Sequence, residues 1–229
     1  MSLKWAVNGL LDDIYFYAQG IPRLLITWKP ENELSILKFF ENNVKKYPNE
    51  IAFIFKDQEI TWLEADIKVS EYGAYLQSEG IEKGDCFALL MDNCPDFLML
   101  LLAAHRIGAI AALINTTVTG EGLKHVVTIV DAKAVILGAS HIDKFNSSMP
   151  ESELLALNLY AIEDSQKIPN EYVDINEQSK GFKDVISHNL KIKDVGMYIY
   201  TSGTTGLPKA ALILSLIHIS EPTRQAEIS

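Results

Sequence analysis

The chain has 229 residues, of which 48% are hydrophobic and 22% charged, and its formal net charge is −10. This length and composition predict a globular protein with one large domain or two small ones. The acidic balance argues against a general nucleic-acid binder, because such binding needs Lys and Arg to neutralise phosphates. Two cysteines and five scattered histidines form no disulfide or zinc pattern, so we expect reduced thiols and no structural metal.

The first 32 residues predict an amphipathic segment rather than a signal peptide, because a short apolar stretch is followed at once by Asp12 and Asp13. Two interpretations stay open: the segment lies on a membrane surface, or it packs on the protein's own body.

A second apolar stretch, 97–115, is interrupted by His105 and Arg106, which are costly in lipid. We therefore expect a buried helix that ends near Gly108 and then a buried strand.

From residue 33 onward, helical and strand patterns alternate. Apolar residues at helical spacing predict a helix that stops before Pro48, and "IAFIFK" (51–56) with "DQEIT" predicts two short strands joined by a turn. A further amphipathic helix runs from Trp62 toward Gly80. The run "CFALLM" (86–91) is typical of a strand that is covered on both faces.

The pattern continues with a helix whose expected N-cap is Asn93, with Pro95 in its first turn and Asp96 three residues from the cap. The next strand is expected at 110–115, and Thr119 is expected to cap a helix with an apolar inner face. The inner-face residues are Leu123, Val126, Val127 and Val130. "AKAVILG" (132–138) predicts another buried strand.

Strands separated by helices of this length predict right-handed βαβ units and an α/β fold with a mainly parallel sheet. The stretch 139–193 is polar and weakly periodic, so we expect a peripheral, partly irregular connection with one strand at 159–162.

The stretch "TSGTTGLPK" (201–209) follows a β-rich run, "MYIY" (197–200), and has the composition of a phosphate-binding loop. Glycines let backbone N–H groups approach phosphate oxygens, hydroxyls donate hydrogen bonds, and lysine adds a positive charge. The spacing fits neither a Walker A loop nor a dinucleotide-binding loop. The candidate ligands are Thr201, Ser202, Gly203, Thr204, Thr205, Gly206 and Lys209.

"YTSGTTGLPKAA" (200–211) resembles the phosphate loop of the adenylate-forming, or AMP-binding, superfamily, which includes acyl-CoA synthetases, luciferase-like enzymes and adenylation domains of peptide synthetases. The stretches 53–66 and 84–125 are similar to its fatty acid transport protein and very-long-chain acyl-CoA synthetase branch. The resemblance covers 33–213, which we interpret as the N-terminal portion of an incomplete adenylation domain.

The resemblance implies a two-step acid–thiol ligase. A fatty carboxylate attacks the α-phosphate of ATP to give an acyl-adenylate and pyrophosphate, and the thiol of coenzyme A then displaces AMP. Residues 201–206 and Lys209 would hold the β- and γ-phosphates with the help of Mg²⁺. The family's catalytic lysine and its metal- and ribose-binding residues match no position of this chain, so its catalytic residues are unknown and the chain alone is expected to be inactive.

The resemblance also implies a fatty acid substrate and a place in the cytoplasm or on a membrane surface that faces it. Ligation of another carboxylic acid and a truncated, non-catalytic homologue remain alternatives.

The last residues of the chain resemble a different kind of sequence. "LSLIHISEPTR" (214–224) resembles the translation of a sequencing-library adapter, so our hypothesis is that 214–229 is a non-native tail.

Overall fold

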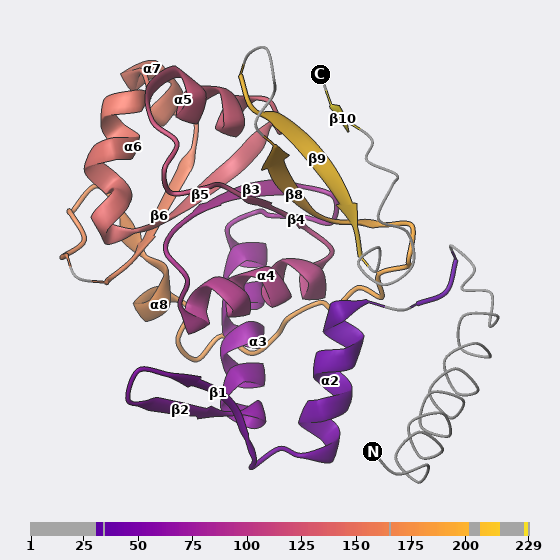
Figure 1. The fold of residues 1–229 in the computed structure, drawn as a ribbon. Coiled ribbons are helices and arrows are strands. Elements are labelled where there is room, and N and C mark those ends of the chain that lie inside the picture. Colours follow the sequence, from indigo (N-terminus) through magenta and orange to yellow (C-terminus); the bar gives the residue numbers. More distant parts are fainter. Residues whose placement is uncertain (1–30, 34, 165, 202–206, 216–226, 229) are drawn as a thin grey trace, which may run out of the picture.

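The computed structural model describes residues 31–33, 35–164, 166–201, 207–215 and 227–228 (Figure 1). The predicted N-terminal segment therefore lies outside the described residues except for Glu31 and Asn32. Glu31 contacts Lys191 and Lys193, which lie just before the strand that leads into the predicted phosphate loop.

The first described elements are a helix and a hairpin, as the sequence predicts. Helix α2 (Ile36–Lys46) begins where the Ser35 hydroxyl accepts a hydrogen bond from the Lys38 amide. Strands β1 (Ile51–Phe55) and β2 (Gln58–Thr61) pair antiparallel. Helix α3 (Trp62–Ser78) follows directly with a capping box, because Thr61 and Glu64 each bond the other's backbone amide.

The main sheet has eight strands in the order β10-β9-β8-β4-β3-β5-β6-β7. All neighbours from β8 to β7 in that order are parallel, whereas β9 and β10 add two antiparallel strands. The strands are β3 (Cys86–Leu90), β4 (Ile110–Leu113), β5 (Ala132–Gly138), β6 (Asn158–Ile162), β7 (Val173–Asp174), β8 (Val195–Thr201), β9 (Lys209–Leu214) and β10 (Glu227–Ile228). This confirms the predicted α/β fold with a mainly parallel sheet.

Helices cover both faces of this sheet (Figure 1). Helices α3 and α4 (Pro95–Ile107) pack on the face to which Phe87 and Leu89 of β3 point. Helices α5 (Gly120–Thr128) and α6 (Ile142–Ser148) pack on the face to which Ala88 and Leu90 point. Every residue of β3 is buried because both faces are covered, as its continuous apolar run predicts.

The stretch 97–115 forms a helix and a strand rather than one long helix. Gly108 ends α4 with a left-handed φ of 73°, which a residue with a Cβ atom rarely adopts, and β4 follows. Within the part of the chain that the structure describes, no helix is both long and apolar enough to cross a membrane.

One predicted helix cap is wrong, and a second is confirmed in position only. Helix α4 has Cys94 rather than Asn93 at its N-cap, and Pro95 is its first residue. Asp96 accepts a hydrogen bond from the Tyr72 hydroxyl (2.6 Å), so it fastens α4 to α3. Thr119 lies at the N-cap of α5, but its side chain makes no capping bond there; the first amide of the helix, Gly120 N, donates instead to Ser148 Oγ of α6 (2.9 Å).

The region 139–193 is more regular than predicted. The expected strand at 159–162 is present as β6, and β7 extends the same parallel sheet. Short helices fill the connections between these strands. They are the 3₁₀ helix η1 (Ala139–His141), α6, α7 (Glu151–Leu154) and α8 (Ile175–Gln178). Such one- or two-turn elements carry too few apolar residues to show a period in the sequence.

Candidate functional site

The predicted phosphate loop joins two antiparallel strands. β8 ends at Thr201 and β9 begins at Lys209, and the two residues are register partners, as are Tyr200 and Ala210 before and after them. Thr201 is half-buried, whereas Lys209 is exposed. The structure thus brings together the two ends of the predicted site. Its remaining members, Ser202, Gly203, Thr204, Thr205 and Gly206, lie outside the described residues.

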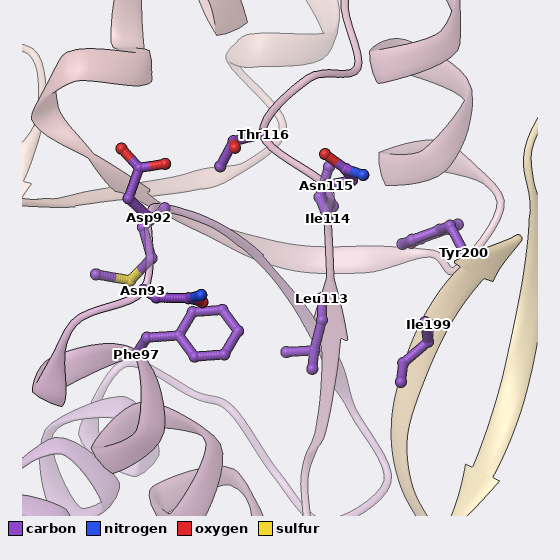
Figure 2. Close-up of a pocket in the computed structure, with 10 residues that line it drawn as sticks. Asp92, Asn93, Phe97, Leu113, Ile114, Asn115, Thr116, Ile199 and Tyr200 are labelled. Atoms are coloured by element: carbon purple, nitrogen blue, oxygen red, sulfur yellow. The ribbon is translucent and has the colours of Figure 1, made fainter.

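A pocket of about 390 Å³ lies at the carboxyl ends of β3, β4 and β8, next to Tyr200 (Figure 2). Its apolar lining residues are Met91, Phe97, Leu113, Ile114 and Ile199. Its polar lining residues are Asp92, Asn93, Asn115, Thr116 and Tyr200. Ligands of open α/β sheets bind outside the carboxyl ends of the strands, so the position and the mixed lining suit a binding crevice.

A chain of polar contacts connects the strand ends around this pocket. His141, just after β5, has its Nε2 atom 3.3 Å from Asp92 Oδ2 and its Nδ1 atom 3.4 Å from Lys144 Nζ. Lys144 of α6 also donates a hydrogen bond to the carbonyl of Thr116. Burial lowers the pKa of Lys144, and the nearby Asp92 carboxylate partly opposes this shift. Lys144 thus attaches α6 to the end of β4, and His141, just before α6, lies beside Asp92 at the end of β3.

Sequence reasoning did not single out these residues. Asp92, Asn115 and His141 each follow within three residues of a buried strand, so a search for polar residues after predicted strands could have found them. Lys144 carries no such signal, because it comes close to the strand ends only through the packing of α6 on the sheet.

The two cysteines are free, and burial raises the pKa of the Cys86 thiol to about 12.

Across the residues that the structure describes, no group of three or more His, Cys, Asp or Glu side chains is placed to hold a metal ion. A thiol that is protonated and enclosed in the core, as Cys86 is, is a poor nucleophile and a poor metal ligand.

The fold agrees with comparisons to known proteins. The family model described as "AMP-binding enzyme" matches residues 40–215. The chain belongs to this family of adenylate-forming proteins. It is 28% identical over 185 residues to the medium/long-chain-fatty-acid–CoA ligase FadD6 of Mycobacterium tuberculosis, a match that covers 81% of this chain and 30% of the relative. It is 27% identical over 215 residues to long-chain fatty acid transport protein 6 of Homo sapiens, covering 90% and 34%.

Solved structures show the same fold. The anthranilate CoA ligase AuaEII in complex with anthranoyl-AMP superposes with a TM-score of 0.72 at 20% identity, covering 80% of this chain and 35% of that one. A fatty acyl CoA synthetase of Mycobacterium tuberculosis superposes with a TM-score of 0.68 at 21% identity, covering 82% and 36%. The chain spans about a third of the length of the relatives that it matches.

Proposed function

We propose that this chain is part of an ATP-dependent ligase that joins a long-chain or very-long-chain fatty acid to coenzyme A, through an acyl-adenylate and with release of pyrophosphate and AMP. The observation that supports this most is the loop 201–209, which joins β8 to β9 in a chain of the AMP-binding family. The names of the relatives support a fatty acid as the acid substrate, and the transport proteins among them support a link to fatty acid uptake.

In this proposal the loop binds the phosphates of ATP. Thr201 and Lys209 are placed opposite each other where the two strands meet the loop, so a hydroxyl donor and a positive charge lie at the same end of the sheet. This arrangement fits a polyphosphate, whose charge a lysine and Mg²⁺ together offset. Ser202, Gly203, Thr204, Thr205 and Gly206 would add backbone and hydroxyl donors. No catalytic residue is assigned within this chain.

The pocket at the strand ends is the second element of the proposal. Its apolar and polar lining residues suit a ligand with both kinds of surface, and Ile199 and Tyr200 at the end of β8 are among them. We further propose that the protein lies in the cytoplasm or on a membrane surface that faces the cytoplasm. We propose no nucleic acid among its partners, in line with the net charge of −10.

The test is pyrophosphate release by the full-length protein with ATP, Mg²⁺ and coenzyme A. We expect turnover with saturated fatty acids, with a maximum at long or very long chains. A panel of aromatic and amino acids tests the alternative acids, because a structure of the same fold is named an anthranilate CoA ligase. Turnover with one of those acids would refute the fatty acid assignment. A folded full-length protein that releases pyrophosphate with none of them would favour a non-catalytic homologue.

A further inference from the structure

Tyr200 is the residue before the predicted phosphate loop, and its hydroxyl has a partner outside its own strand. It donates a hydrogen bond to the backbone carbonyl of Val126, in the last turn of α5. Carbonyls in the last turn of a helix have no amide of their own helix to bond, so they need a donor from elsewhere. The contact therefore satisfies a helix end and joins it to the end of β8.

The surroundings of Tyr200 make this contact well defined. Its ring packs against the core layer between the sheet and helices α5 and α6. Burial raises the pKa of the Tyr200 hydroxyl, so it remains a protonated donor over the physiological range. Its register partner on β9, Ala210, is fully buried. Tyr200 and Ala210, one residue further from the loop than Thr201 and Lys209, are thus packed in the core layer.

We propose that Tyr200 is a positioning residue for the nucleotide phosphates. Its hydroxyl fixes the end of β8 against α5, and this sets the place of Thr201 and of its partner Lys209 on β9. The inference rests on the proposed function, because it takes these two residues as phosphate ligands. Without the hydroxyl, the strand end has more freedom, and part of the binding energy of ATP is lost in ordering it again.

Tyr200→Phe tests this with the smallest possible change, because it removes the hydroxyl and keeps the ring. A matched control is Tyr198→Phe. Tyr198 is two residues earlier on the same strand, points to the same face of the sheet and is half-buried, and its hydroxyl makes no hydrogen bond within the described part of the chain. Both variants are made in the full-length protein. ATP affinity is measured by calorimetry, and KM values by pyrophosphate release.

We expect Tyr200→Phe to weaken ATP binding and to raise the KM for ATP by about 3- to 10-fold, the range for one neutral hydrogen bond. The KM for the acid should stay unchanged, and Tyr198→Phe should match the wild type. Unchanged ATP affinity in Tyr200→Phe, or an equal rise in both KM values, would overturn the inference while leaving the proposed function standing. A wild-type protein that does not bind ATP would overturn both.

Discussion

His105 is a titratable side chain in the last turn of α4 that the predicted chemistry does not use. It is fully buried, and neither ring nitrogen has a hydrogen-bond partner in the described part of the chain. Its ring lies so close to Gly196 of β8 that an added Cβ atom there would be 3.0 Å from His105 Nε2. Burial lowers the pKa of His105 to about 4, and a contact with the Gly196 backbone opposes this shift.

The lowered pKa predicts a loss of stability in acid. The unfolded chain takes up a proton near pH 6.5, whereas the folded chain takes it up only near pH 4, so stability is full above pH 6.5 and falls as the pH drops toward 4. The His105 contribution to this loss is about 3 kcal/mol. The measurement is the free energy of unfolding of the full-length protein at pH 7.5 and 4.5, for wild type and His105→Leu.

The leucine variant should lose less stability over this pH range by about that amount, because it has no proton to bind. Equal acid sensitivity in the two proteins would show that His105 is not the group responsible. Gly196→Ala, which crowds the same ring without changing charge, is expected to destabilise the protein by about 1–3 kcal/mol at both pH values.

At the scale of elements, α6 holds the loop between β4 and α5. Lys144 bonds the carbonyl of Thr116, and Ser148 accepts from the amide of Gly120, so one short helix is attached to this loop at two points. Asn115 adds a local turn by accepting from the amide and the hydroxyl of Thr117 (both 2.9 Å). Because Asn115 and Thr116 line the pocket, α6 sets the position of one of its walls.

Lys144→Met should loosen this wall, because it removes a hydrogen bond from a charged donor and keeps most of the side-chain volume. We expect amide exchange in residues 115–119 to become about tenfold faster, which corresponds to about 1.5 kcal/mol. Hydrogen-exchange mass spectrometry of the full-length protein measures this.

Lys180→Met is the control for that change, since Lys180 forms an exposed ion pair with Glu177 outside the pocket lining. Unchanged exchange at 115–119 in the Lys144 variant, or the same change in both variants, would mean that α6 does not fix this loop.

The same elements show which parts of the fold the sequence can predict. Strand β3 is a continuous apolar run, β5 is apolar except for the exposed Lys133, and Gly108 ends a helix. These features are visible in the sequence and are sufficient to predict the elements. The start of α4 was misplaced by one residue because Asn93 is a good capping residue in isolation, whereas Pro95 at the first helical position makes Cys94 the cap. The hydrogen bond from Lys144 to the Thr116 carbonyl depends on how α6 packs against the sheet, which no local pattern records.

At the scale of the whole molecule, the family match extends past the predicted phosphate loop, and the described residues on its far side form β9. The match ends at residue 215, and β9 pairs with β8 along its full length to Leu214. Within 214–229 the structure describes only Leu214, Ser215 and the two backbone positions of β10, so the hypothesis of a non-native tail stays a prediction. The gene itself provides the test.

An independent reading of the coding sequence from genomic DNA should agree with this chain up to about Ile213 and then differ. The reason for expecting more protein is length, because the relatives that the chain matches are about three times as long as this chain. The new residues should continue β9 and add further elements of the family. A genomic sequence that encodes the same 16 residues at 214–229, followed by a stop codon, would refute the adapter hypothesis.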